Sequence, residues 1–462
     1  LAGYWGVKVL TMETTRAFAL WQLQLMFNRG AARQFNRLWG WYAASYLTAY
    51  NSKGEWVIDS EPAAFDRVPG RWAPGCGLSQ NAIERVYRMA FFSGANFFER
   101  EDTDSNFWNP RLTGEERWKP APEGQMFIDF HTFSRKHPDR GAAYTPVALL
   151  VPHDRGSFRT IGKAFRKYRY LKSDHMFDAF IATLYTHCPV NPALKKGIEQ
   201  TLRNSPYGDI FDILTPDFPD QSSFRGILPA YKVAVLIGEY PEHPEMAASL
   251  QEYVRNGGTL VLNARHLEKN FKADFTGVTP CGVAGHDGAY VLEKLELSGA
   301  SSILSDSSGN ALFTSFRYGK GNVIVAAPHW LVPDFDDSGD LGDYILSDTE
   351  NGKMHFKYIQ ALLQQICRET LPVRVHGDIQ YGLNKTPTGW WIYLFNNEGI
   401  QKFTDTPETF DPAKKATVSI DLGALQPKRT VELISGKPVS APGNRIETEV
   451  NPGRYQLFQI EL

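Results

Sequence analysis

Carboxylates stand at the ends of two apolar, strand-like segments in the first hundred residues. Glu13 closes the apolar run at residues 7–12 and directly precedes Thr14, Thr15 and Arg16. Residues 95–100 lead into a second charged group, made up of Glu99, Arg100, Glu101 and Asp102. Two carboxyl groups placed across a glycosidic bond can act as nucleophile and acid–base catalyst. Glu13, Glu99 and Glu101 are therefore the candidate catalytic residues.

Both groups also have a structural interpretation. An acidic side chain at a helix N-terminus interacts favourably with the helix dipole, and Glu13 precedes a helix-like segment. The charged group at residues 99–102 fits an Arg–Glu network along the rim of a sheet. Residue types and spacing leave both interpretations open.

Aromatic residues are concentrated in the same part of the chain. Eight of the eleven tryptophans precede residue 120. Sugar rings are flat and partly apolar and stack on aromatic side chains, so the clustering favours a carbohydrate site, with an aromatic core as the alternative. The candidate substrate-binding residues are Trp5, Arg16, Trp39, Trp41, Arg100, Asp102 and Trp108.

Residues 1–140 alternate strand-like and helix-like segments, which must position these side chains. Strands are predicted at residues 7–12, 38–46 and 95–100, and helices at 17–34, 81–93 and 123–136, the second of them N-capped by Ser79. This order is typical of a parallel sheet. Three βα units cannot close a (β/α)8 barrel, which takes about 250 residues. We therefore expect either the C-terminal part of a barrel or a small open sheet.

Residues 141–372 predict a doubly wound α/β domain. Strands are expected at residues 144–151, 209–214, 231–237 and 259–263, with a helix at 244–255, a hairpin at 311–327 and a helix at 354–369. The order resembles that of class I glutamine amidotransferases and of flavodoxin-like domains. The turns after the third and fourth strands hold no nucleophilic Cys or Ser, so we expect packing and oligomer contacts here.

Residues 373–462 show no helical pattern. Alternating runs separated by Gly, Pro, Asn and Asp predict a small antiparallel β-sandwich. The predicted domains are thus 1–140, 141–372 and 373–462.

The composition excludes several classes of protein. The chain has 462 residues, and its net charge of −2 argues against binding to nucleic acid or to an anionic membrane. No apolar run reaches the ~18 residues that span a bilayer. The four cysteines are far apart, the pairs His131/His137 and His153/Asp154 have weak metal-ligand spacing, and nucleotide-binding motifs are absent. We therefore expect neither metal nor cofactor.

Two short motifs resemble the end of the barrel in glycoside hydrolase family 42 (GH42) β-galactosidases. They are VLTMET at residues 9–14 and SGANFFER at residues 93–100. The order of the three predicted domains is also similar to that family's barrel, amidotransferase-like trimerisation domain and small β domain. The resemblance implies a retaining β-galactosidase-like hydrolase acting on a plant or algal glycan. It also implies a bacterial homo-oligomer, dimer or trimer, with Glu13 as nucleophile.

Two features of the sequence depart from the GH42 pattern. The family's acid–base Glu stands on the fourth barrel strand, and we expect this chain to begin after that strand and to be inactive alone. If residues 95–100 form strand eight, Glu13 ends strand six, and the expected nucleophile strand at 38–46 has no carboxylate. Glu99 and Glu101 are the reserve candidates.

Other interpretations stay open. A neighbouring clan of barrel glycosidases with the same layout fits equally well. A non-catalytic carbohydrate-binding or assembly protein is the alternative from another class, and a glycosidase whose first half is a separate chain is a third. The compartment is also undecided between the cytoplasm and the bacterial periplasm or exterior.

Overall fold

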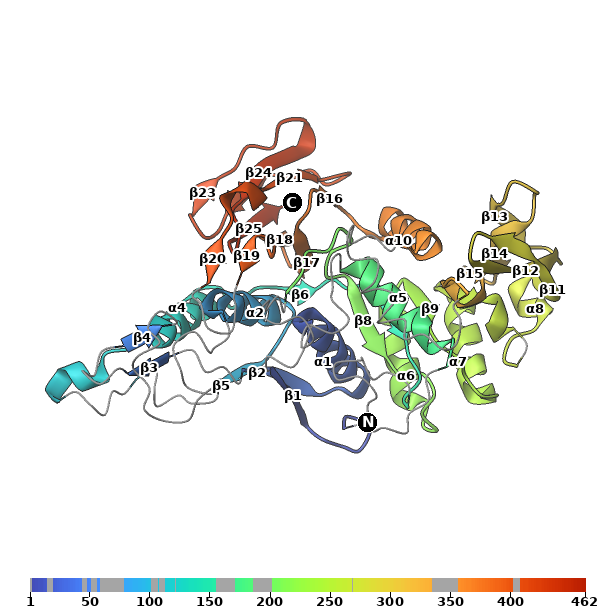
Figure 1. Cartoon of the computed structure of the whole chain (residues 1–462), viewed down its shortest axis with the longest axis horizontal. Helices are drawn as coiled ribbons and strands as arrows, with labels where there is room; N and C mark the ends of the chain where they lie inside the picture. The colour runs from blue at the N-terminus through green and yellow to red at the C-terminus, as the bar shows by residue number, and fades with distance from the viewer. Residues whose placement is uncertain are drawn as a thin grey trace.

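The computed structural model describes residues 2–14, 20–43, 48–50, 56–58, 79–100, 107, 113–120, 122–154, 171–185, 202–267, 269–334, 356–401 and 408–462. The fold is α/β, and its larger sheets lie in three groups (Figure 1). Among the helices in these ranges, none is both long and apolar enough to cross a membrane.

The N-terminal group is a three-stranded parallel sheet with helices following its strands. Its order is β1-β2-β5. The elements, in chain order, are β1 (Val9–Thr14), α1 (Trp21–Phe35), β2 (Leu38–Ala43), α2 (Gln80–Phe92), β5 (Phe97–Arg100) and α4 (Pro122–Lys136). This confirms the predicted β-α-β-α-β-α order. The predicted cap is also confirmed, because the Ser79 side chain accepts a hydrogen bond from the backbone N–H of Ala82 at 2.9 Å. A separate two-stranded ribbon pairs β3 (Thr48–Tyr50) with β4 (Trp56–Ile58).

The second group is a seven-stranded sheet of order β13-β14-β15-β10-β9-β7-β8. Its strands are β7 (Val147–Leu150), β8 (Phe211–Leu214), β9 (Val233–Leu236), β10 (Thr259–Asn263), β13 (Ser301–Ser305), β14 (Ala311–Tyr318) and β15 (Gly321–Ala326). The strands from β8 to β15 pair in parallel, whereas β14 and β13 are antiparallel. In chain order the parallel strands lie 2-1-3-4-5, so the first connection and the later ones run in opposite directions along the sheet.

Helices cover both faces of this sheet. They are α5 (Asp174–Leu184), α6 (Ser222–Ile227), α7 (Pro244–Arg255), α8 (Ala273–Thr276) and α10 (Lys357–Thr370). Along β7, Val147 and Leu149 join the core that contains α5 and α10, while Ala148 and Leu150 join the core that contains α6 and α7. A hairpin of β11 (Val278–Asp287) and β12 (Tyr290–Leu297) follows α8. The sequence patterns predicted neither this hairpin nor β13.

The C-terminal group consists of two antiparallel sheets around a core that includes Val373, Ile392, Val418 and Ile446. One sheet holds β16 (Arg374–His376), β21 (Ala416–Asp421) and β24 (Arg445–Val450). The other holds β6 (Ala142–Ala143), β17 (Gln380–Thr386), β18 (Gly389–Phe395), β22 (Arg429–Glu432), β23 (Lys437–Pro438) and β25 (Tyr455–Glu461). A short pair, β19 (Ile400–Gln401) and β20 (Thr409–Phe410), lies beside them.

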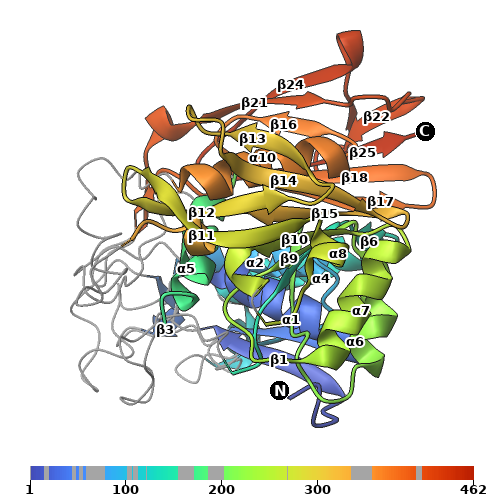
Figure 2. The ribbon, with the colours of Figure 1, turned by 90° about the vertical axis from the view of Figure 1, so that its right-hand side faces the viewer.

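Helices α2 and α4 lie between the three-stranded sheet and the C-terminal strands (Figures 1 and 2). The ring of Phe92 at the end of α2 stacks on Tyr393 of β18 with centroids 4.9 Å apart. On the other side, α2 shares its core with Trp39 and Trp41 of β2. The helix layer therefore has apolar contacts above and below.

Helix α1 packs against two sheets at once. Leu23 and Met26 join the core of the seven-stranded sheet, whereas Trp21 and Leu25 join the core of the three-stranded sheet. The closest approach is at Gly30, where a Cβ would lie 2.0 Å from the carbonyl oxygen of Ile213 in β8. No side chain fits there, so glycine is required by the distance between helix and strand.

A buried ion network centred on Arg29 of α1 joins these groups. Arg29 is 1% exposed, and all five of its N–H donors have acceptors. Its Nε donates to Asp212 at 2.6 Å, and its two terminal nitrogens donate to both oxygens of Asp209 at 2.7 and 2.8 Å. The remaining donors reach the Ser93 hydroxyl and the Phe211 carbonyl.

Further residues complete the network from other elements. Arg33 of α1 and the hydroxyl of Tyr231 donate to the second oxygen of Asp212, at 2.6 and 2.8 Å. The hydroxyl of Tyr393 in β18 lies 3.3 Å from Asp209. Burial raises the pKa of Asp212, but the charges of Arg33 and Arg29 outweigh this effect and hold it below its usual value. The network is thus a balanced set of two guanidinium and two carboxylate groups.

Buried His266 ties the ends of β10 and β9 together. Its Nδ1 accepts the backbone N–H of Asn263 at 3.0 Å, so the proton resides on Nε2, which donates to the Gly238 carbonyl at 2.7 Å. Burial lowers the pKa of His266 to about 4, against smaller opposing contributions from the Gly238 carbonyl and Glu239. The folded protein therefore favours the neutral imidazole.

This arrangement predicts a loss of stability in mild acid. The contribution of neutral His266 is complete above the unfolded pKa of about 6.5 and is lost as the pH falls toward the folded value of about 4. The shift corresponds to about 3 kcal/mol of unfolding free energy. Melting temperatures between pH 7.5 and pH 4.5 should therefore fall less steeply for His266→Gln than for the wild type. Exposed His376 provides the control, since His376→Gln should keep the wild-type slope. An unchanged slope in His266→Gln would contradict the prediction.

Candidate active site

The carboxyl ends of β1, β2 and β5 bring the backbone positions of two candidate glutamates into one row. Glu13 pairs in register with Tyr42, and Tyr42 pairs with Glu99. Parallel strands in register end at the same edge of a sheet, and two strand spacings separate the Cα atoms of the two glutamates by about 10 Å. Tyr42, which no sequence motif marks as functional, stands between them.

The two faces of this sheet differ in what covers them. Trp39 and Trp41 of β2 are 4% and 0% exposed and lie in the core formed with α1 and α2. On the opposite face, the ring of Phe97 lies over Gly40, where a Cβ would approach it to 2.5 Å. Because successive residues of a strand point to opposite faces, Tyr42 belongs to the face of Gly40 rather than to that of the tryptophans.

The burial of Trp39 and Trp41 corrects their predicted role. A sugar ring can stack only on an aromatic face that it can reach, and the helices cover both indoles. The aromatic-core interpretation therefore describes these two residues, and the alternation of β2 is the physical reason. The spacing of Trp39 and Trp41, two positions apart on one strand, already places both side chains on the same face of the sheet.

Glu99 and Arg100 end β5 in different environments. The Glu99 side chain is exposed, and its backbone carbonyl accepts a hydrogen bond from the Tyr87 hydroxyl of α2 at 2.6 Å. Arg100 is 8% exposed, and its guanidinium lies 5.6 Å from the ring centre of Phe127 in α4. Tyr87 thus fixes the strand end that presents Glu99, while Arg100 packs toward the helices.

Trp5 lies at the other end of the sheet. It belongs to the turn that precedes β1, so it stands beside the amino ends of the strands, with 72% of its surface exposed. The structure does not bring Trp5 together with Glu13 and Glu99. The side chain of Glu13, and the candidates Arg16, Glu101, Asp102 and Trp108, lie outside the described residues.

A cavity of about 400 Å³ occurs elsewhere in the molecule. It lies between α6 and α7 beside the amino ends of β9 and β10, and its lining includes Arg225, Tyr231, Lys232 and Glu252. None of its lining residues comes from the three-stranded sheet. The described part of the chain therefore places the backbone positions of Glu13 and Glu99 at one sheet edge, away from this cavity, and carboxylates at such positions can transfer protons or attack as nucleophiles.

Several solved structures with a similar fold are β-galactosidases. A catalytic mutant of Gan42B, a GH42 β-galactosidase from G. stearothermophilus, is 11% identical with a TM-score of 0.50, over 98% of this chain and 59% of that chain. The β-galactosidase from Bacillus circulans sp. alkalophilus is 12% identical with a TM-score of 0.50, over 98% and 60%. A cold-adapted β-galactosidase from a Rahnella species is 11% identical with a TM-score of 0.51, over 99% and 61%.

These similarities are similarities of fold. The sequence identity is too low for the functional roles of residues in those enzymes to be assigned to residues of this chain. The chain spans about 60% of the length of each of these three structures. No protein-family model and no curated protein sequence matches it. Over nearly its whole length, the chain therefore resembles the GH42 β-galactosidases in fold.

Proposed function

We propose that the complete protein hydrolyses glycosidic bonds and that Glu13 is its nucleophile. In this proposal the three-stranded sheet belongs to a (β/α)8 barrel, the reaction retains the anomeric configuration, and the substrate is a β-galactoside-like unit of a plant or algal glycan. Residues 141–372 and 373–462 are then separate domains that accompany the barrel. The self-association expected from the GH42 resemblance stays a prediction.

The observation that carries the proposal is the register of Glu13, Tyr42 and Glu99 at one sheet edge. In (β/α)8 enzymes, catalytic groups stand at the carboxyl ends of the strands. A carboxylate there can attack the anomeric carbon while a second carboxyl group protonates the leaving oxygen. The similarity in fold to GH42 β-galactosidases supports the same class of reaction.

Glu99 is the alternative nucleophile. Strand β2 lies between β1 and β5, and it ends in Ala43 rather than in a carboxylate. If β5 is the last barrel strand, the strand that carries the nucleophile in the GH42 pattern is β2. The exposed position of Glu99 on the last strand supports its candidacy in that case.

A mechanism-based label distinguishes these assignments. The complete polypeptide is incubated with a 2-deoxy-2-fluoro-β-galactosyl fluoride, assayed on an aryl β-galactoside, digested and examined by mass spectrometry. We expect loss of activity together with one added sugar on the peptide that contains Glu13, because a retaining enzyme forms a covalent glycosyl intermediate. A label on Glu99 or Glu101 would overturn the role of Glu13. Saturable sugar binding without label or turnover would favour the non-catalytic alternative.

A further inference from the structure

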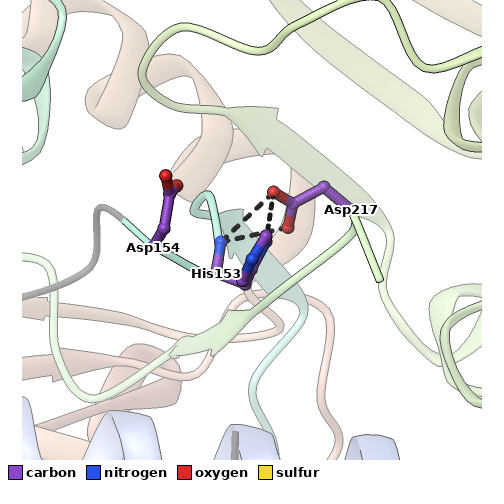
Figure 3. A group of neighbouring side chains, drawn as sticks. All are labelled: His153, Asp154 and Asp217. Atoms are coloured by element: carbon purple, nitrogen blue, oxygen red, sulfur yellow. Dashed lines mark hydrogen bonds and ion pairs between the residues drawn. The ribbon is translucent and has the colours of Figure 1, made fainter. Parts of the chain in front are cut away.

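Three potential metal ligands meet at the carboxyl edge of the seven-stranded sheet. His153 and Asp154 follow β7, and Asp217 follows β8 (Figure 3). In open sheets with the strand order 2-1-3-4-5, ligands bind at the carboxyl ends of the strands beside the first strand, which here is β7. The trio therefore occupies the edge where such sheets bind ligands.

The ligand atoms of the trio are close together. Nδ1 of His153 lies 2.8 Å from Oδ2 of Asp217, and one ligand atom from each residue lies within 4.8 Å of the others. Figure 3 shows the two carboxylates on either side of His153. Ligands of a tetrahedral ion at about 2.1 Å are about 3.4 Å apart. The His153–Asp217 pair would open slightly, and the carboxylate of Asp154, an exposed residue, would exchange its present interaction for the ion by turning inward.

Asp217 is held in place by hydrogen bonds within its own loop and by the backbone N–H of His153. Both of its oxygens accept the backbone N–H of His153, at 3.0 and 3.3 Å. The side-chain amide of Gln221 donates to the carbonyls of Pro216 and Phe218 at 2.7 and 2.6 Å, which fixes the backbone on both sides of Asp217. Only 5% of the Asp217 side chain is exposed, so the carboxylate keeps one position without a metal. Such preorganisation reduces the entropy lost on binding.

An aromatic contact orients the imidazole. The His153 ring lies 5.4 Å from the ring of Phe218, which also stacks in parallel on Tyr4 at 4.3 Å and meets Phe35 edge-on at 5.8 Å. The His153 side chain is still 40% exposed, so an ion can reach it from solvent. With a neutral imidazole, the trio holds two negative charges, which a divalent cation would balance.

We propose that His153, Asp154 and Asp217 bind one divalent cation of the zinc class. In the metal-free pair Nδ1 of His153 donates to Asp217, so its proton must pass to Nε2 when the ion binds. Nδ1 and one oxygen of each aspartate then supply three ligands, and water completes the coordination sphere. Imidazole with carboxylate ligands suits Zn²⁺ and its neighbours, and three protein ligands leave an open position. The site is independent of Glu13 and of glycoside hydrolysis.

A second histidine–carboxylate pair, His329 and Glu293, resembles His153 and Asp217 but should not bind a metal ion. Nε2 of His329 lies 2.9 Å from Oε2 of Glu293, which is as buried as Asp217. Among the described residues, no third acidic or cysteine ligand joins that pair, whereas the ligand atoms of the trio all lie within 4.8 Å of one another. His329→Gln therefore provides the control for the loss of a single histidine from a His–carboxylate pair.

The test is a calorimetric titration of the full chain with Zn²⁺, after all bound metal has been removed from the protein. We expect one equivalent to bind to the wild type. His153→Gln and Asp217→Asn should each weaken binding on the order of 100-fold or more, because each removes a ligand, and Asp154→Asn should weaken it less. His329→Gln should bind like the wild type. Circular dichroism checks that each variant is folded.

A second readout excludes binding through cysteine. Co²⁺ in place of Zn²⁺ should give d–d absorption without the intense thiolate charge-transfer band, and Cys281→Ser should leave the spectrum unchanged. Absence of saturable binding would overturn the proposal, as would equal binding by wild type and His153→Gln. In either case the pair is only a hydrogen bond that closes the β7 loop. The assignment of Glu13 is unaffected by any of these results.

Discussion

Replacing Arg29 with methionine is expected to lower the free energy of unfolding by about 3–5 kcal/mol. The substitution introduces an apolar side chain of similar size, leaves Asp209 buried without its cation, and leaves Asp212 with its remaining ion pair to Arg33. It also removes the hydrogen bonds that Arg29 donates to the Phe211 carbonyl and the Ser93 hydroxyl. Uncompensated buried carboxylates are costly because the interior screens charge poorly. Urea unfolding followed by fluorescence and circular dichroism measures the change.

The control for Arg29→Met is an exposed ion pair. Lys415 and Glu449 lie 2.6 Å apart with about half of each side chain exposed, and Lys415→Met should cost less than about 1 kcal/mol. Replacing Arg29 and Asp209 together should be less harmful than the sum of the single changes, since the pair is removed as a unit. A loss below 1 kcal/mol for Arg29→Met would show that the network contributes little.

The same network predicts a limit of stability in strong acid. The pKa of Asp212 is lower in the folded protein than its usual value, because Arg33 and Arg29 outweigh the effect of burial. Its contribution is therefore present above the unfolded pKa of about 3.9 and is lost as the pH falls through the folded value. This loss begins below the range in which His266 titrates, so the two contributions separate along the pH axis.

Glu13→Gln in the complete polypeptide is expected to reduce turnover of an aryl β-galactoside by at least about 10³-fold, which is about 4 kcal/mol of transition-state stabilisation. The amide keeps the size of the side chain but cannot attack the anomeric carbon or stabilise positive charge there. The fold should be unaffected, because the change neither adds nor removes volume. Rates at saturating substrate, with melting temperatures for each variant, measure the effect.

Comparison with other glutamates locates the site. Glu99→Gln and Glu101→Gln should reduce turnover less than Glu13→Gln if they only brace the sheet edge. Glu116→Gln, in the exposed turn at Gly114–Trp118, should leave turnover unchanged. If Glu13→Gln remains active while Glu99→Gln is inactive, the nucleophile belongs to the last strand of the three-stranded sheet.

Local patterns predicted several elements to the residue. The predicted bounds of α7 and β10 agree with the structure, since Pro244 begins the helix and Gly257, with φ of +122°, follows its end. Proline at the first turn and glycine beyond the last one are signals carried by adjacent residues. The cap at Ser79 and the β-α-β-α-β-α order are local in the same sense.

Contacts between distant residues could not be predicted in this way. Arg29 and Asp212 are 183 positions apart, and nothing near either residue indicates the other. Strand β6, two residues after the predicted end of the first domain, pairs with β17 in the C-terminal sheet. Asp217 likewise reaches His153 across 64 positions. These partners depend on strand order, which the hydrophobic pattern of a single strand does not encode.

The candidate site shows the same division. The sequence by itself determined that Glu13 and Glu99 stand at the carboxyl ends of strands, because apolar runs and the polar residues that end them are local features. Only the tertiary structure decided that these two positions share one row with Tyr42, and that Trp39 and Trp41 face the helices instead of a ligand. The register depends on how the strands pair, and the environment of each side chain depends on which face of the sheet the helices cover. Both features are set by packing over the whole chain.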